Sequence, residues 1–138
     1  MDERYIITSI GHVHRQANKF IESELRKNEI GGIAPSHGDI LFQLYKNESL
    51  TMQQLAKLID RDKSTVTVLV NKLVDLGYIS KTLDVHDARV SNLSVTQKGK
   101  ELRPLFEEIS NRLLAKVYSE FTHEEKTILL QLLQKIKL

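Results

Sequence analysis

Residues 62–77 combine short hydrogen-bonding side chains with a regular apolar pattern. The apolar residues recur at i, i+3, i+4 and i+7, as one face of a helix requires, and they are Val66, Leu69, Val70, Leu73 and Leu76. At about 100° per residue, the opposite face holds Ser64, Thr67, Val68, Asn71 and Asp75, with Lys72 at its edge. Short hydroxyl and amide groups can meet base edges in a DNA major groove, whereas a solvated helix face more often carries long Lys and Glu side chains. Taken alone, the pattern also fits an ordinary amphipathic helix.

The residues around this segment predict where helices begin and end. Asp62 is placed to cap the polar helix and Gly77 to end it. Residues 51–54 read Thr-Met-Gln-Gln, a capping-box pattern that opens a short helix through Leu55, Leu58 and Ile59. A turn over residues 60–63 then joins the two helices, as in a helix-turn-helix.

Two strands are predicted after the second helix. Residues 78–83 and 91–95 alternate in polarity with a period of two, and the charged segment 84–90 separates them. They predict a hairpin with a charged tip. Two helices followed by such a hairpin have the order of a winged helix-turn-helix, which favours DNA binding.

The same residues resemble the MarR family of bacterial transcription regulators. The recognition-helix pattern of the family matches residues 62–77, and its wing pattern matches Asp84, Asp87, Arg89, Leu93, Thr96 and Gly99. The resemblance implies a mainly α fold with a small β-hairpin wing, flanked by N- and C-terminal dimerisation helices. It also implies a homodimer that binds double-stranded DNA, with Arg89 entering the minor groove and Asp87 orienting it. The DNA-binding residues expected on this basis are Lys63, Ser64, Thr65, Thr67, Val68, Asn71, Lys72, Asp87 and Arg89.

Two positions depart from the family pattern. Val68 lies where many members have an arginine, and His86 lies where the wing often has a first arginine. Each departure removes a possible DNA contact. The departures therefore bear on the target sequence more than on the activity itself.

Length, charge and composition limit the possible classes of protein. The chain has 138 residues, of which 41% are hydrophobic, which suits one domain with a core of its own. Its net charge is only +2, so binding to nucleic acid requires a local basic patch. No apolar run approaches the roughly 18 residues that span a bilayer, and no signal peptide is recognisable, so we expect a cytoplasmic protein without a membrane partner. The absence of cysteine excludes disulfides and sensing by cysteine oxidation.

The rest of the chain reads as helices. A long amphipathic helix is predicted over about 4–27, and the breaker at 31–35 is followed by Ser36, which can cap the next helix. We expect one domain over 1–138, with a DNA-binding lobe at about 36–96 and dimerisation helices at about 4–28 and 97–138.

The C-terminal part predicts two further helices. Thr96 can cap a helix over about 97–121, in which Pro104 is expected to cause a kink near the start. A second capping box at 122–125 opens a final helix that is apolar almost all round. Burial in a dimer interface would explain that composition.

No catalytic motif stands out, so we expect no enzyme and no cofactor. His37 and Asp39 could join a metal site, but scattered histidines are more often structural, and we predict none. A pseudo-palindromic operator, repression and a small-molecule effector between the dimerisation helices and the lobe follow from the resemblance. The alternative is a winged-helix module that binds protein and not DNA, which the fold permits. The polar outward face and the retained Arg89 favour the regulator.

Overall fold

The structure is a computed structural model that describes residues 1–138. It contains a short 3-10 helix, seven α-helices and three strands. In chain order these are the 3-10 helix Glu3–Tyr5, α1 (Ile6–Lys27), α2 (Pro35–Lys46), β1 (Leu50–Thr51), α3 (Met52–Ile59), α4 (Lys63–Asp75), β2 (Ile79–Leu83), β3 (Ser91–Val95), α5 (Gln97–Glu101), α6 (Arg103–Val117) and α7 (His123–Lys135). The predicted mainly α fold with a β-hairpin wing is confirmed. None of the helices combines the length and apolar character that a membrane-spanning segment needs.

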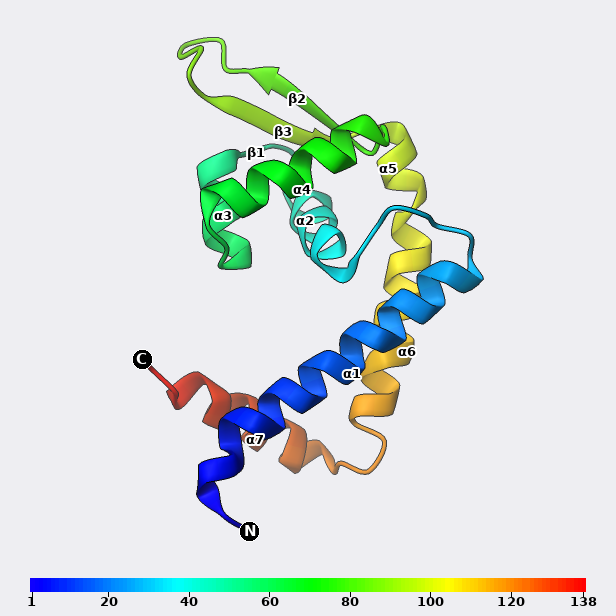
Figure 1. The fold of residues 1–138 in the computed structure, drawn as a ribbon, viewed down its shortest axis with the longest axis vertical. Coiled ribbons are helices and arrows are strands. Elements are labelled where there is room, and N and C mark those ends of the chain that lie inside the picture. The colour runs from blue at the N-terminus through cyan, green and yellow to red at the C-terminus, as the bar shows by residue number, and fades with distance from the viewer.

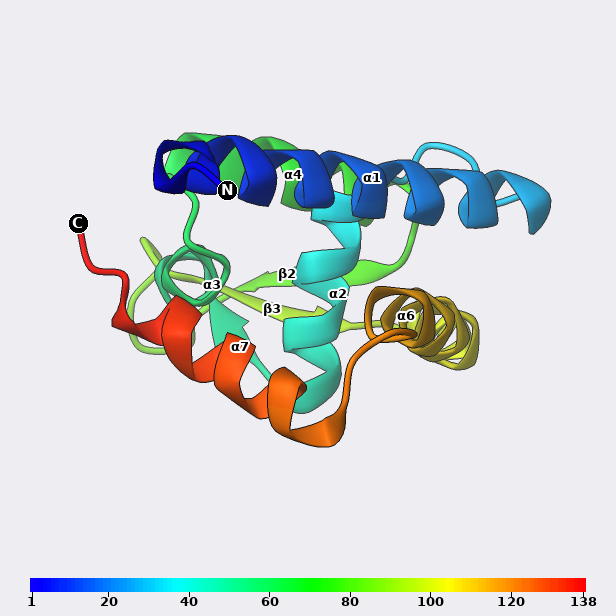
Figure 2. The ribbon, with the colours of Figure 1, turned by 90° about the horizontal axis from the view of Figure 1, so that it is seen from below.

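The elements from α2 to β3 form a winged-helix lobe, and the long helices extend away from it (Figure 1). The lobe lies at the top of that view, α1 and α6 lead downward from it, and α7 lies at the opposite end. In the view from below, α1 and α7 lie along opposite sides of the picture in front of the lobe, and α6 is seen almost end-on (Figure 2).

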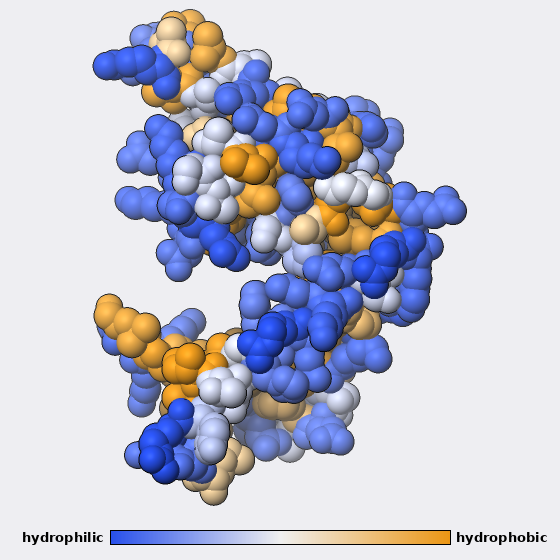
Figure 3. Space-filling view, viewed as in Figure 1, coloured by the Kyte–Doolittle hydropathy of each residue, from blue (hydrophilic) through white to orange (hydrophobic).

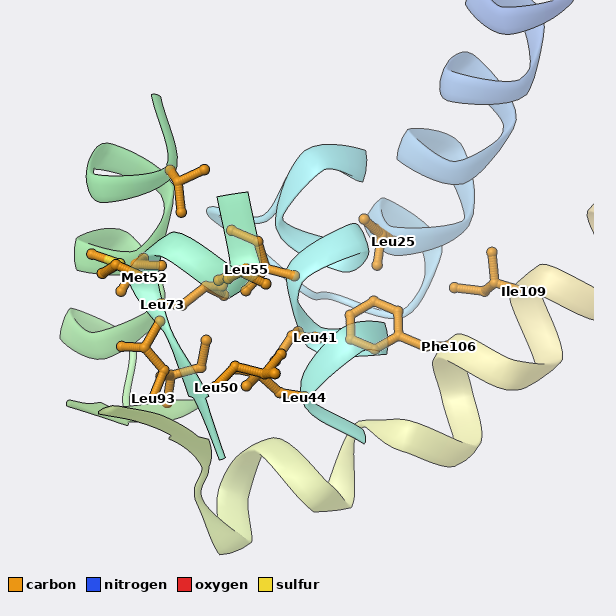
Figure 4. Packing of buried hydrophobic residues seen from close by; sticks show 14 residues of the cluster. Leu25, Leu41, Leu44, Leu50, Met52, Leu55, Leu73, Leu93, Phe106 and Ile109 are labelled. Atoms are coloured by element: carbon orange, nitrogen blue, oxygen red, sulfur yellow. The ribbon is translucent and has the colours of Figure 1, made fainter. Parts of the chain in front are cut away.

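One apolar core connects the lobe to the long helices (Figure 4). Its 14 buried residues come from every helix and strand of the lobe, and Leu25 of α1 with Phe106 and Ile109 of α6 extend it. Each such side chain contributes on the order of 1.5–3 kcal/mol when fully buried. The lobe therefore cannot turn freely against α1 and α6, because that motion would expose these three residues.

The wing is the outer part of a three-stranded antiparallel sheet with the order β1-β3-β2. Strand β3 pairs with β2 along its whole length, with Lys81 opposite Leu93, and with the two residues of β1. The sequence predicted β2 and β3 to within one residue but not β1. Two residues are too few to show a period-two pattern, so only the pairing with β3 defines this strand.

The start of α2 differs from the prediction that Ser36 caps it. The helix begins at Pro35, with Ala34 as the preceding cap residue. The fixed φ of proline suits a first helical position. His37 takes over the capping role, because its Nδ1 accepts a hydrogen bond of 2.9 Å from the Ala34 N–H. Its side chain is almost wholly buried.

The predicted helix over 97–121 is divided. It forms α5, capped by the Thr96 hydroxyl as expected, and α6, which ends at Val117. The break at Leu102 lies where Pro104 predicts it, since proline has no N–H to donate to the Lys100 carbonyl, as a continuous helix would require. After Val117 the chain closes a turn in which Tyr118 and Phe121 meet edge to face, so the helix stops short of the predicted end.

An ion pair between a buried carboxylate and a half-exposed arginine joins α1 to α6. Only 2% of Glu24 is exposed, and its Oε2 accepts a hydrogen bond of 2.6 Å from Arg112. Lys27 lies 3.6 Å from the other carboxylate oxygen. Removing Arg112 would leave the buried Glu24 carboxylate with Lys27 as its only nearby cation, so the pair holds α1 and α6 in register.

Gly99, the last glycine of the wing pattern, lies where α5 passes the end of α4. A Cβ at this position would overlap the carbonyl oxygen of Tyr78 and a methyl group of Val95. Gly38 offers the opposite case, because it lies inside α2 with no atom within 4 Å of an added Cβ.

We predict that Gly99→Ala lowers the free energy of unfolding by about 1–3 kcal/mol, because a methyl group there must displace backbone. Gly38→Ala should raise it by up to about 1 kcal/mol, since alanine costs less helix entropy than glycine. Urea denaturation followed by circular dichroism measures both. An equal increase in the free energy of unfolding for both variants would show that α5 has room to move away from Tyr78.

Candidate nucleic-acid interface

The polar helix predicted at 62–77 is α4, and Asp62 caps it as expected. The Asp62 Oδ1 accepts hydrogen bonds from the Thr65 N–H at 2.7 Å and from the Ser64 hydroxyl at 3.0 Å. These bonds lower the pKa of the Asp62 carboxyl, the Thr65 bonds being the largest cause. The carboxylate therefore stays ionised. Its negative charge also interacts favourably with the positive end of the helix dipole.

The helix buries one face and presents another to solvent. Val66, Val70 and Leu73 are fully buried, whereas Val68 on the opposite face is 70% exposed. Ser64, Asn71 and Asp75 are exposed beside Val68. An isolated exposed valine contributes nothing to the core, and Val68 lies at the centre of this exposed face. Helix α4 itself runs beside the wing (Figure 1).

Two cations of α4 lie on opposite sides of this face. Lys63 lies toward the wing, as does Thr67 one turn later. Lys72 and Thr65 project from the other side, by the helical angle of about 100° per residue. A Cβ on Gly32 would lie 3.3 Å from the Lys72 Cε, so this side chain rests against the loop between α1 and α2. The structure thus separates Lys72 from the predicted residues that lie toward the wing, Lys63, Thr67 and Arg89.

Two hydroxyl groups of α4, those of Ser64 and Thr67, already donate to protein acceptors. Ser64 donates to Asp62, and the Thr67 hydroxyl donates to the Lys63 carbonyl at 2.8 Å. Toward solvent, these two hydroxyl oxygens can therefore act as hydrogen-bond acceptors. Their matching partner on a base edge is an amino group, of the kind that adenine and cytosine present in the major groove.

The wing tip is closed by its own hydrogen bonds. The Asp84 carboxylate accepts from the N–H groups of His86 and Asp87 and from the Asn92 side chain, at 3.0–3.1 Å. The bond from Asn92 is the main cause of a lowered pKa of Asp84. Sequence reasoning matched Asp84 to the family pattern, and its structural role is to shape the loop that carries Arg89.

Asp87 holds Arg89 in one orientation. Its carboxylate accepts from the Arg89 Nε at 3.1 Å, from Nη2 at 3.2 Å and from the backbone N–H at 3.0 Å. The Arg89 side chain is 91% exposed, so solvent screening makes the pair weak in energy. Its effect is geometric, since the bond from Arg89 keeps the pKa of Asp87 low and the guanidinium fixed at the wing.

A groove separates the recognition helix from the wing. It has a volume of about 290 Å³ and is lined by Thr51, Met52, Gln53, Lys63, Thr67, Lys81, Arg89, Val90 and Ser91. Three of these are cations, which come from α4, from β2 and from the loop between β2 and β3. Lys81 was absent from the predicted interface. The alternation of β2 could have indicated it, because Lys81 shares a strand face with the buried Ile79 but lies beyond the core.

His37 and Asp39, considered for a metal site, do not form one. His37 uses its Nδ1 to cap α2. No group of three His, Cys, Asp or Glu side chains in the structure could hold a metal ion.

Comparison with known proteins agrees with this geometry. A family model described as the MarR family matches residues 31–90. The chain is 26% identical over 134 residues to the uncharacterised HTH-type transcriptional regulator YybA of Bacillus subtilis, covering 96% of this chain and 86% of YybA.

Solved structures extend the likeness to the whole chain. A MarR protein from Peptoclostridium difficile superposes with a TM-score of 0.88 and 27% identity, covering 98% of this chain and 86% of that one. A cysteine-to-serine mutant of Escherichia coli MarR complexed with operator DNA has the same fold, with a TM-score of 0.84, 18% identity and 98% of each chain covered. From its motif, its fold and these relatives, the chain belongs to the MarR family of winged-helix, DNA-binding transcription regulators.

Proposed function

We propose that the protein is a homodimeric repressor that binds a pseudo-palindromic operator in double-stranded DNA. The observation that carries this proposal is the exposed polar face of α4 beside Arg89, which Asp87 holds in place on the adjacent wing. A helix of this kind fits a major groove, and an arginine beside it fits the neighbouring minor groove. The Escherichia coli MarR structure with operator DNA, which has the same fold, supports the proposal.

The predicted interface residues divide by the chemistry of their side chains. Ser64, Thr67, Val68 and Asn71 are proposed to meet base edges, because they are short and three of them are polar. Lys63, Thr65 and Lys72 are proposed to contact phosphates, with Lys72 approaching the backbone on the side away from the wing. Asp87 positions Arg89 for the minor groove.

Dimerisation is proposed from the apolar surface of the long helices. On α7, Ile128 and Leu132 form an apolar stripe, and Ile136 follows the end of the helix; each of the three is about half exposed. Apolar side chains gather over this end of the molecule (Figure 3). An apolar hollow of about 460 Å³ between α1, α6 and α7 adds to this surface. A patch of this kind is typical of an interface, so residues 4–28 and 97–138 are proposed to pair with a second copy.

A small-molecule effector is proposed at the junction of the lobe and the long helices. A cavity of about 280 Å³ lies there between α1, α2 and α6, lined mostly by apolar side chains with Asp39 and Ser110 among them. A ligand that widened this junction would alter the angle between the lobe and α1. Ligands that stabilise the protein against heat should release it from operator DNA, and stabilisation without release would contradict an effector role.

We predict that the protein shifts the DNA flanking its own gene in an electrophoretic assay, and that Arg89→Ala weakens this binding severalfold or more. The reason is the loss of a preoriented cation at the minor groove. Arg89→Lys should recover only part of the affinity, because lysine cannot make the two-atom contact with Asp87. Arg26→Ala, which removes a charge from exposed α1, is the control. No binding of any DNA by the wild type would favour the protein-binding module instead.

Val68 should favour A·T pairs, since a valine offers only apolar contact and matches the methyl group of thymine. Two such half-sites should lie about one helical turn apart, roughly 10 base pairs. Val68→Arg should shift the preference toward G·C at one or two positions in each half-site. Selection from random duplexes with both proteins measures this. If the two proteins enrich the same sequences, Val68 does not face the bases.

Sedimentation at micromolar concentration should give about twice the 15.9 kDa chain mass. Leu132→Asp should produce a folded monomer, because a charge in the α7 stripe cannot be buried against a second copy. Gln131→Asp adds the same charge on the polar side of α7 and should leave the dimer intact. A monomeric wild type would rule out the two-fold operator.

A further inference from the structure

The groove between α4 and the wing holds more positive charge than the recognition of bases requires. Lys63, Lys81 and Arg89 all line it. Arg89 is paired with Asp87, whereas neither lysine takes part in any ion pair of the structure. Lysines without ion-pair partners in a groove attract an anion.

The position of the groove selects a nucleic-acid strand. The major and minor grooves of DNA are separated by one sugar-phosphate strand. If α4 lies in one groove and Arg89 in the next, that strand must pass between them, which is where the lysines lie. Around them the groove also offers hydroxyl and amide groups from Thr51, Gln53 and Ser91, which are common partners of phosphate oxygens.

The sheet fixes Lys81 at this place. Lys81 pairs in register with Leu93, which is fully buried, and it follows Ile79 by two residues on the same strand face. Its backbone is therefore held in the sheet, while the residue is exposed and lines the groove. A lysine on a rigid strand can set the distance at which a strand of DNA passes the wing.

We propose that this groove seats one phosphate of the DNA strand between α4 and the wing, and that Lys81 is its principal contact from the wing. This inference rests on the proposed DNA binding and adds a residue that does not read bases. Lys81 sets the position of the duplex, so its effect is the same on every sequence.

Lys81→Gln tests this role by salt dependence. Because a homodimer carries two copies of Lys81, the slope of log K against log salt should fall in magnitude by about 1.8, and affinity should fall about thirtyfold near 0.15 M salt, on operator and on random DNA alike. Lys81→Arg should restore both values, and Lys19→Gln on α1 is the matched control. An unchanged slope in a variant that still binds would overturn the inference while leaving the proposed function intact.

Single methylphosphonate groups in the operator locate the contact. A neutral group at one phosphate in each half-site should weaken the wild type, whereas the same group should cost Lys81→Gln nothing further. Equal losses for both proteins at every phosphate would refute a specific seat. Inorganic phosphate distinguishes a DNA phosphate from a free anion as the occupant of the groove. If millimolar phosphate displaces DNA more strongly than chloride does at the same ionic strength, the groove is a site for free anions, and the assignment to DNA is overturned.

Discussion

The close contact between the start of α5 and the end of α4 is the constraint on which the interface depends. The Thr96 hydroxyl donates to the Gly77 carbonyl at 2.6 Å, and the Thr96 N–H donates to the Tyr78 carbonyl at 3.0 Å. From the other side, the Tyr45 hydroxyl donates to the Gly99 carbonyl at 2.6 Å. Burial is the main cause that raises the pKa of Tyr45 to about 12, so the phenol remains a donor. Helix α4, the wing and α2 are thus fixed around one point.

This arrangement explains how a chain with a net charge of +2 can still present a basic site. Three acidic residues near the interface are occupied, Asp62 in capping α4, Asp84 in closing the wing loop and Asp87 in orienting Arg89. Each carboxylate is committed to a local hydrogen bond, and so shapes the backbone that carries the cations. Overall charge is therefore a poor guide to nucleic-acid binding in this protein, and the placement of a few side chains decides it.

The sequence was sufficient for those features that depend on local chemistry. The caps Thr51, Asp62, Thr96 and Thr122 all accept the hydrogen bonds that their positions predict, because capping involves residues only three apart. Features set by contacts distant in sequence were missed. Strand β1 exists only through β3, Lys72 rests on the loop near Gly32, and Leu58, expected on an apolar face, is half exposed. The groove containing Lys81 likewise arises from the packing of three separate elements.

The histidine that caps α2 also links the fold to protons. His37 can accept from Ala34 only while its Nδ1 is unprotonated. Burial, and then the nearby charge of Lys72, lower the pKa of His37 from its ordinary 6.5. Below pH 6.5 the unfolded chain therefore binds a proton at His37 more readily than the folded chain does. The contribution of neutral His37 to the free energy of unfolding is complete above that pH and declines as the solution becomes more acidic. Acidification would thus weaken the cap that holds the end of the loop against which Lys72 of the recognition helix rests.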